Sequence, residues 1–302
     1  MSLLAGIDGG QSSTVAVIGD EGGRVLALGT AGPCDEIGVA RDSTRLQDAL
    51  RGALDDASRR ANLREGSRFA AIVAGISGYD GRVHGRAPEL PSSRVVLMHD
   101  TPIAHAGALG GLPGVIVIAG TGSVIYARGA DGCSRTLGGW GFLFGDEGSG
   151  FRIACDALAM LMRAQDENQS SFDAELQAAN EFFGTASLRR LVHAFYKGKI
   201  TRDRLAAFAP MAMRFDAFRA LVNGGADRLA TLAAAAMHGG VPPRVAFVGG
   251  IFSDAGFRQR VRDGILRARP DAEIVQARYQ PAAGALLLAY RELGLGVAEL
   301  QT

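Results

Sequence analysis

Short apolar segments separated by glycine turns make up the start of the chain. Leu3–Ile7 ends at Asp8, Thr14–Ile18 follows two glycines and two serines later, and Arg24–Leu28 comes after a turn at residues 20–23. Such β-rich runs, punctuated by glycine, predict an antiparallel meander of three strands.

A change of period marks the first predicted helix. Within Ser43–Asn62, leucine and alanine recur every three or four positions, as on one face of a helix. Two strand-like runs, Ala70–Ala74 and Val95–Met98, come next. Thr101–Leu109 is then predicted to be a helix, with Asp100 or Thr101 as its N-cap.

The opening pattern then occurs a second time. Val115–Ala119 is apolar, a glycine turn follows, and Val124–Arg128 and Ser134–Leu137 are strand-like around a second turn at residues 130–132. The order of strands and turns matches that of the first thirty residues when Ala119 is aligned with Asp8. We interpret the match as an internal duplication, which rests on pattern because identity between the copies is low.

The second half of the chain is predicted to be mostly helical before it returns to strands. Alternating strands and helices indicate mixed α/β layers, and the glycines and proline at Leu109–Gly114 suggest a domain boundary. The predicted helices are Gly150–Arg163, Ser187–Tyr196, Arg202–Met213, Phe215–Met237, Ala255–Ala268 and Ala282–Leu293, and the predicted strands are Arg244–Val248 and Glu273–Gln276.

Composition narrows the class of protein. With 302 residues, 47% of them apolar, the chain is long enough for about two domains with their own cores. A formal net charge of +1 argues against general nucleic-acid binding. Cys34, Cys133 and Cys155 form neither a disulfide framework nor a metal motif, which indicates reduced thiols in a cytoplasmic protein. The start of the chain lacks the pattern of a signal peptide, and Leu229–Met237 is too short to cross a membrane.

The first glycine hairpin, Asp8–Thr14, has the composition of a phosphate-binding turn. Glycine lets backbone N–H groups approach an anion closely, and Ser12, Ser13 and Thr14 add hydroxyl donors. A carboxylate such as Asp8 belongs near phosphates only with a cation between them, which hydrated Mg²⁺ would provide. A plain hairpin turn, in which Asp-Gly is common, is the alternative.

The second hairpin, Gly120–Ser123, has the same chemistry without the carboxylate. A phosphate-binding turn at the same place in both copies of a duplicated unit is much stronger evidence than either turn alone. It suggests that the two hairpins bind one ligand. Neither hairpin is a P-loop or a dinucleotide-binding GxGxxG turn.

Three further features are candidates for function. Gly138–Gly150 holds six glycines, the only tryptophan and the acidic pair Asp146 and Glu147, where a simple helix start would explain only the acidic residues. Asp100 follows a strand, where it is equally suited to accept a proton from a hydroxyl or to cap the next helix. Val245–Gly250 ends in two glycines, which suits either a flat ligand or a strand-to-helix turn.

Taken together and in this order, the motifs resemble those of the superfamily of sugar kinases, actin and heat-shock chaperone ATPases. More narrowly, the chain resembles the N-acetylglucosamine kinase / BadF-BadG-BcrA-BcrD ATPase family over essentially its whole length. GIDGG at 6–10, AGTGS at 119–123, GGWGFLFGDEGSG at 138–150 and FVGG at 247–250 carry the resemblance, and the third of these is the most specific.

The resemblance implies two actin-like (ribonuclease H-like) α/β lobes with ATP and Mg²⁺ in a cleft between them. We expect an N-terminal lobe of residues 1–110, joined by the C-terminal helix at about 282–302, and a C-terminal lobe of 111–281 with a helical insertion. The implied activity is ATP-dependent phosphorylation of an amino sugar such as N-acetylglucosamine. Glucosamine or another sugar, or ATP hydrolysis on behalf of a partner protein, are the alternatives.

The resemblance also implies a role for each matching residue. Asp100 would be the general base for the sugar hydroxyl, and Asp8 would hold Mg²⁺ through water. The implied ATP-binding residues are Asp8, Gly9, Gly10, Gln11, Ser12, Ser13, Thr14, Gly120, Thr121, Gly122, Ser123, Gly249 and Gly250. The implied sugar-binding residues are Asp35, Ser77, Gly78, Asp100, Thr121, Gly139, Trp140 and Asp146.

Three positions depart from the family pattern. Gln11 stands where many relatives have a third glycine, and Leu137 stands where an N-acetylglucosamine kinase can have cysteine. Asp35 stands where relatives that phosphorylate N-acetylglucosamine commonly have asparagine. An ionised carboxylate only accepts hydrogen bonds and would favour an amine, so the sugar stays open. The expected partner is a small sugar, with no nucleic acid and no membrane, and relatives that are dimers leave a homodimer open.

Overall fold

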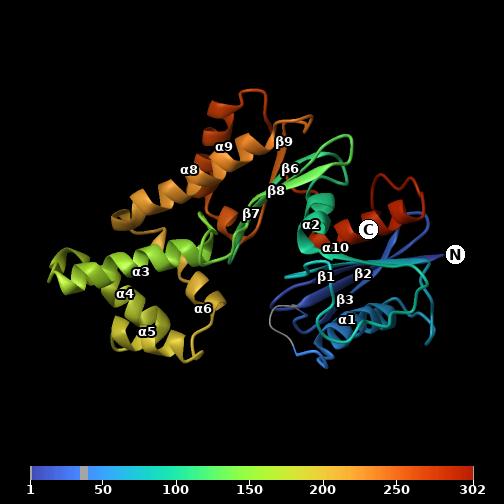
Figure 1. Cartoon of the computed structure of the whole chain (residues 1–302), viewed down its shortest axis with the longest axis horizontal. Coiled ribbons are helices and arrows are strands. Elements are labelled where there is room, and N and C mark those ends of the chain that lie inside the picture. Colours follow the sequence, from blue (N-terminus) through green and yellow to red (C-terminus); the bar gives the residue numbers. More distant parts are fainter. Residues whose placement is uncertain (1, 35–39, 302) are drawn as a thin grey trace. The chain divides into compact units, whose positions relative to one another are not determined.

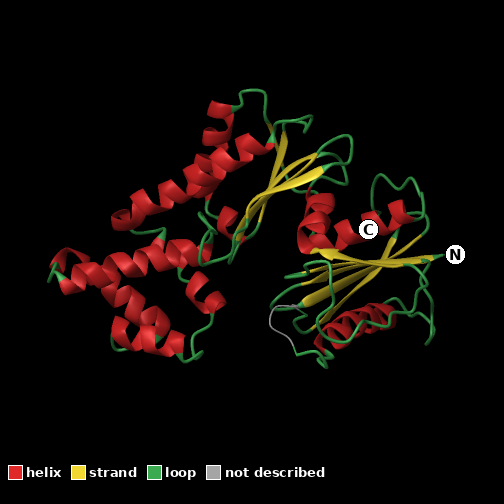
Figure 2. Ribbon diagram, viewed as in Figure 1, coloured by secondary structure: helices red, strands yellow, loops and turns green. Residues whose placement is uncertain are grey.

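The chain divides into two compact units, as the computed structural model shows for residues 2–34 and 40–301 (Figure 1). Unit 1 runs up to Leu112 and resumes at Gln276, and unit 2 is Pro113–Val275. Each unit has a five-stranded mixed sheet with helices packed on it (Figure 2), which confirms the predicted α/β class. Among the described residues, no helix is long and apolar enough to span a bilayer.

The sheet of unit 1 begins with the predicted meander. β1 (Leu3–Gly9) pairs antiparallel with β2 (Thr14–Asp20), which pairs antiparallel with β3 (Val25–Ala31). β4 (Ala71–Ile76) and β5 (Val95–His99) extend the sheet in parallel on the other side of β1, giving the order β3-β2-β1-β4-β5. β1 and β4 are therefore central strands, which explains their nearly unbroken apolar sequence.

Helices cover both faces of this sheet (Figure 1). On one face, α1 (Arg45–Arg60) buries the predicted stripe of leucine and alanine against β2 and β3. On the other face, α2 (Asp100–Ala108) and α10 (Pro281–Glu292) pack against β1, β4 and each other. Adjacent residues of β1 take part in the two different cores, because side chains of a strand alternate between faces.

Two glycines let α10 lie directly on its neighbours. A Cβ atom on Gly6 of β1 would lie 2.1 Å from the backbone nitrogen of Leu286. A Cβ atom on Gly284 of α10 would lie 2.0 Å from the carbonyl oxygen of Ile103 in α2. Any side chain at either position would force the backbones apart, so these glycines set how closely α10 approaches β1 and α2.

The sheet of unit 2 has the same plan. β6 (Gly114–Ala119), β7 (Ser123–Arg128) and β8 (Ser134–Gly138) form an antiparallel meander. β9 (Arg244–Val248) and β10 (Glu273–Val275) continue it in parallel, giving the order β10-β9-β6-β7-β8. Strand for strand this matches unit 1, so the predicted duplication is confirmed at the level of topology.

The helices of unit 2 bury a single large core that includes the apolar positions of α3 and α8. Their bounds are α3 (Gly150–Asp166), α4 (Asp173–Phe183), α5 (Leu188–Tyr196), α6 (Arg202–Ala206), α7 (Ala209–Ala212), α8 (Arg219–Ala236) and α9 (Ala255–Ala268), with short 3-10 turns at Ser170–Phe172, Asp216–Phe218 and Gly250–Ser253.

Several helix predictions need correction. The single helix predicted for Arg202–Met213 is wrong, because α6 and α7 are separate and Pro210 sits in the first turn of α7. Proline lacks an N–H group and disfavours a helical residue before it, so it restarts a helix more readily than it continues one. Helix α4 was absent from the prediction, since its apolar residues are sparse.

The starts of two helices near the glycine motifs also differ from expectation. The N-cap of α2 is His99, whose side chain accepts from the Thr101 N–H, so the predicted Asp100 or Thr101 cap is wrong. The N-cap of α3 is Ser149, and no acidic residue lies in the first turn of this helix. Asp146 and Glu147 precede the helix and are therefore not explained as its first-turn acids.

Candidate functional site

Two carboxylates come together at the carboxyl ends of parallel strands in unit 1. Asp8 near the end of β1 is in register with Gly75 of β4, and Ile76 is in register with His99, directly before Asp100. Asp8 and Asp100 thus lie on either side of β4, which has Gly75 next to Asp8. Burial of Asp8, together with the charge of Asp100, raises the pKa of the Asp8 carboxyl to about 6.

Asp8, with the negative charge of Asp100 nearby, fits a divalent cation. In a partly desolvated site, one ionised carboxylate makes ionisation of a second one unfavourable and so raises the pKa of the second. A nearby cation offsets this repulsion. Within the described residues, no group of three or more histidine, cysteine or acidic side chains is arranged to hold a metal. Mg²⁺ typically uses only one or two carboxylates and takes its other ligands from phosphate and water. Asp8 suits that kind of binding.

Replacing Asp8 with asparagine is expected to stabilise the ligand-free protein at pH 7.5. The pKa of Asp8 is higher in the folded than in the unfolded chain, so ionised Asp8 opposes folding above pH 6. We expect Asp8→Asn to gain on the order of 1–2 kcal/mol at pH 7.5. The gain should shrink as the pH falls through 6 and vanish near pH 4, because wild-type Asp8 is then protonated. Thermal unfolding at pH 7.5 and pH 4 measures it, and an equal gain at both values would contradict the argument.

Three of the residues predicted to bind phosphate in the first hairpin are exposed to solvent. Gln11, Ser12 and Ser13 are exposed in a turn closed by the Gly10 N–H donating to the Ser13 carbonyl at 2.9 Å. Thr14 differs from them, because its side chain is fully buried and its hydroxyl donates to the Gly32 carbonyl at 2.8 Å. Thr14 therefore fixes the shape of the hairpin, and its hydroxyl is already in use.

The chain around this hairpin brings one predicted sugar-binding segment close. The Ser77 N–H donates to the Gly9 carbonyl at 2.8 Å, which places Ser77 and Gly78, just after β4, beside the first hairpin. Gly9 also packs on the buried Cys34, whose sulfur would lie 2.1 Å from a Cβ atom at position 9. Asp35 comes directly after Cys34 but lies outside the described residues.

The second hairpin and Asp146 form one bonded group in unit 2. The Ser123 N–H donates to the Asp146 carboxylate at 3.2 Å, and the Ser123 hydroxyl donates to the Glu147 carbonyl at 2.8 Å. A Cβ atom on Gly122 would lie 2.9 Å from the same carboxylate. The pKa of Asp146 is raised, mainly by burial. The structure thus joins two motifs that are about two dozen residues apart in the sequence.

The start of α3 also packs on this hairpin, and so does the Gly249-Gly250 turn. The Gly150 N–H donates to the Gly120 carbonyl at 2.8 Å and the Phe151 N–H to the Thr121 carbonyl at 3.2 Å. A Cβ atom on Gly249 would lie 2.3 Å from the Ala119 carbonyl oxygen. Gly249 has a φ of 108°, which favours glycine. The second hairpin, Asp146 and Gly249-Gly250 therefore gather at one end of the unit 2 sheet.

The remaining predicted sugar residues lie on the loop that follows β8. Gly139 has a φ of 67°, and Trp140 is 77% exposed. Leu137 in β8 is partly buried against the core of unit 2. The loop also carries Leu143 and Phe144, which are more than two-thirds exposed. Their exposure gives the loop a large apolar surface beside Asp146, the residue at its far end.

Sequence reasoning missed three residues that contact the predicted ones. His99 lies 2.8 Å from Asp100, measured between Nδ1 and a carboxylate oxygen. Asp203, which follows the N-cap of α6, accepts from the Thr121 hydroxyl at 3.0 Å. Arg202 stacks on Phe142 and Phe151, and its positive charge acts on Asp146. Asp203 could not be found from sequence, because it lies some eighty positions from the hairpin that it contacts.

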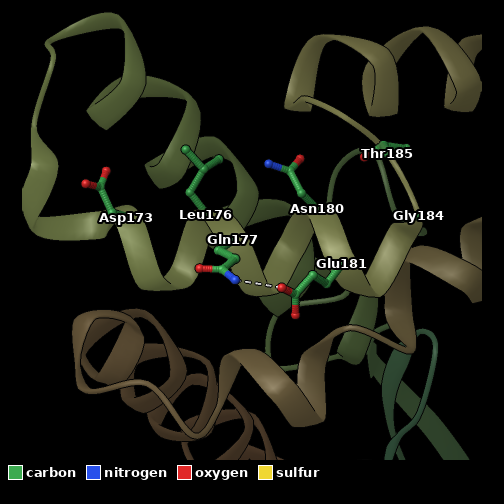
Figure 3. A pocket seen from close by; sticks show the side chains of 7 residues that line it. All are labelled: Asp173, Leu176, Gln177, Asn180, Glu181, Gly184 and Thr185. Atoms are coloured by element: carbon green, nitrogen blue, oxygen red, sulfur yellow. Dashed lines mark hydrogen bonds between the residues drawn. The ribbon is translucent and has the colours of Figure 1, made fainter.

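A separate hollow on α4 contains none of the predicted site residues (Figure 3). It has a volume of about 560 Å³ and includes the Gln177 side chain, which donates to Glu181 at 2.8 Å. Its lining residues are Asp173, Leu176, Gln177, Asn180, Glu181, Gly184 and Thr185. This hollow therefore does not coincide with the glycine motifs.

Comparison with known proteins gives one matching family over nearly the whole chain. The model of the BadF/BadG/BcrA/BcrD ATPase family matches residues 5–289. A protein of Clostridium acetobutylicum named N-acetylmuramic acid/N-acetylglucosamine kinase is 29% identical over 216 residues, which are 68% of each chain. An N-acetyl-D-glucosamine kinase of Dictyostelium discoideum is 29% identical over 55% of this chain and 56% of its own length.

Solved structures show the same fold. A protein of Chromobacterium violaceum, provisionally described as an N-acetylglucosamine kinase, has 27% identity and a TM-score of 0.77, with 96% of this chain and 99% of that chain covered. A ROK hexokinase of Thermus thermophilus has 18% identity and a TM-score of 0.57, with 96% and 99% covered. The predicted actin-like sugar kinase fold is thereby confirmed.

Proposed function

The chain belongs to the BadF/BadG/BcrA/BcrD ATPase family, and from this premise we propose that it transfers the γ-phosphoryl group of ATP to a hydroxyl of an amino sugar. Two curated relatives are named as amino-sugar kinases, and a neighbour with similar structure is described in the same way. The proposed enzyme is a sugar kinase and, more narrowly, a kinase of the N-acetylglucosamine type.

The observation that carries the proposal is the pair of Asp8 and Asp100. Phosphoryl transfer to a sugar hydroxyl needs a carboxylate near a cation and a second one free to accept a proton. Asp8 and Asp100 lie at one edge of the sheet, and the pKa of Asp8 is raised to about 6 by burial and by Asp100. In this proposal Asp8 holds Mg²⁺ through water and Asp100 is the general base.

In this proposal the glycine turns bind the nucleotide. Bound Mg·ATP supplies the phosphoryl group and a divalent positive charge. The exposed residues Gln11, Ser12 and Ser13 offer backbone N–H and side-chain donors to phosphate oxygens, and Thr121 and Gly122 offer their backbone N–H groups. Gly249 and Gly250 present bare backbone at the end of β9, which suits the flat adenine ring.

The sugar is proposed to be an N-acetylated amino sugar, with glucosamine as the alternative. The names of both curated relatives include N-acetylglucosamine. Asp35 instead of asparagine and Leu137 instead of cysteine are the features of this chain that favour a different group at the sugar nitrogen. In the proposal Ser77, Gly78, Gly139, Trp140 and Asp146 complete the sugar site.

A coupled assay of ADP release over a panel of sugars tests the proposed function. We expect release with Mg²⁺ and N-acetylglucosamine or a related amino sugar, and little release without sugar. Equal release with and without sugar would instead indicate an ATPase that serves a partner protein. No release with any sugar, although ATP binds, would indicate a nucleotide sensor.

We further propose that the enzyme acts in the cytoplasm, and that it forms a homodimer. Cys133 and Cys155 are free thiols. Reduced thiols are typical of the cytoplasm. Light scattering after size exclusion tests the second proposal, and a mass of 31.5 kDa at every concentration would contradict it.

A further inference from the structure

His99 has one ring nitrogen shared between two contacts that need opposite protonation states. Its Nδ1 accepts from the backbone N–H of Thr101 at 3.2 Å, as the N-cap of α2. The same Nδ1 lies 2.8 Å from a carboxylate oxygen of Asp100. The cap needs a lone pair on Nδ1, whereas a hydrogen bond to a carboxylate needs a proton there. The two contacts therefore cannot both be made at full strength.

We infer that His99 is a positioning residue that controls whether Asp100 is free to act as a base. With Nδ1 unprotonated, His99 caps α2 and leaves the Asp100 carboxylate available. With Nδ1 protonated, His99 holds that carboxylate in an ion pair and releases the Thr101 N–H. The inference rests on the proposed role of Asp100 as the general base.

The exposure of the pair suits such a role. The side chains of His99 and Asp100 are 49% and 36% exposed, so both can exchange protons with solvent. The hydroxyl of Thr101 also contacts Nδ1. It can donate to Nδ1 when that nitrogen is unprotonated and accept from it when it is protonated. Thr101 itself is buried, which fixes the start of α2 and keeps these atoms together.

Among the described residues, the charged group paired with His99 is Asp100. Asp100 raises the pKa of His99, while partial burial of the ring opposes that increase. Asp100 also contributes to the raised pKa of Asp8 on β1. The end of β4, in register with His99, contributes the uncharged Ile76, and the next acidic residue along the chain, Asp80, is paired with His84. The first residues of α10 are proline and alanine, and the charged residues of this helix lie at its other end.

The test is the pH dependence of kcat/KM in two variants of His99. Asparagine is a good N-cap but carries no proton, so His99→Asn keeps the helix start and removes the ion pair. We expect the acid limb of His99→Asn to move to lower pH, with roughly tenfold more activity retained at pH 6, relative to pH 8, than in wild type. His99→Ala, which loses the cap as well, should show the same shift with a lower melting temperature.

Asp8 stays in place in both variants, so an acid limb that arises from Asp8 is common to all three proteins. A matched control is His84→Asn, which removes the other His–Asp pair of unit 1. It should leave the pH profile unchanged. Superimposable profiles for wild type and His99→Asn would overturn the inference and leave the proposed kinase activity intact.

A second readout does not depend on activity. The chain has five histidines, so the ring signals of His99 in a proton NMR titration can be assigned as those lost in His99→Asn. We expect the pKa of His99 to fall in Asp100→Asn, because the negative partner is gone. An unchanged His99 titration in Asp100→Asn would overturn the inference, even if the protein proved to phosphorylate no sugar.

Discussion

Asp100→Asn is expected to lose sugar phosphorylation by about 10²–10⁴-fold while still binding ATP. Asparagine keeps the shape of the side chain but cannot accept a proton from the attacking hydroxyl. The phosphate-binding turns lie on other segments and stay intact, so ATP affinity should change little. Initial rates of sugar-dependent ADP release measure the loss, and calorimetric titration with ATP measures the binding.

A control for charge alone comes from α1. Asp55 is exposed and pairs with Arg51 one turn away, a kind of pair that contributes little to stability. Asp55→Asn removes the same charge and should retain wild-type turnover. If Asp100→Asn also turned over at a near-normal rate, Asp100 would be excluded as the base, and the proposed mechanism would need another acceptor.

Gly284→Ala is expected to destabilise the protein by about 3 kcal/mol, at the upper end of the usual range for overpacking. The new methyl group would lie 2.0 Å from the Ile103 carbonyl oxygen and 2.3 Å from the Gly107 nitrogen. Both are backbone atoms, which cannot rotate away as a side chain can, so α10 and α2 must separate. Because α2 begins at Asp100, activity should fall together with stability. Scanning calorimetry and kcat/KM measure the two effects.

The same substitution at Gly224 is the matched control. Gly224 lies inside α8, and a Cβ atom there meets nothing within 4 Å. Alanine is the better helix former, so Gly224→Ala should stabilise unit 2 by about 0.5–1 kcal/mol. Opposite signs for the two variants would show that contact across the helices, and not helix propensity, decides the result. Stabilisation by Gly284→Ala would contradict the close approach of α10 and α2.

Much of the fold could be predicted because local pattern and tertiary burial agree. The stripe of α1 has a helical period and is buried as a stripe, and both meanders are formed by short apolar runs around glycine turns. Helix α4 was missed because it buries only Ala179 and Phe183, which gives its sequence little periodicity. The α6–α7 break was missed because Pro210 was included in an otherwise helical pattern.

The segments of the candidate site could be predicted from the sequence, whereas the contacts between these segments are seen only in the structure. The register of β1, β4 and β5 brings Asp8 and Asp100 to one edge, which no spacing along the chain reveals. Ser123 and Asp146 meet for a similar reason. His99 could not be predicted as the N-cap, because histidine is not a preferred capping residue and Asp100 and Thr101, beside it, are of the preferred kinds.

The placement of α10 has a consequence for how the protein is made. Unit 2 is one continuous stretch, Pro113–Val275, so all of it is synthesised before the segment that returns to unit 1. Until that segment follows, the face of β1 and β2 that α10 covers stays open, with Leu4 and Val17 uncovered. Since domains fold as units during synthesis, unit 2 is able to fold first. The nascent chain thus carries a complete second half while its first half still awaits its last helix.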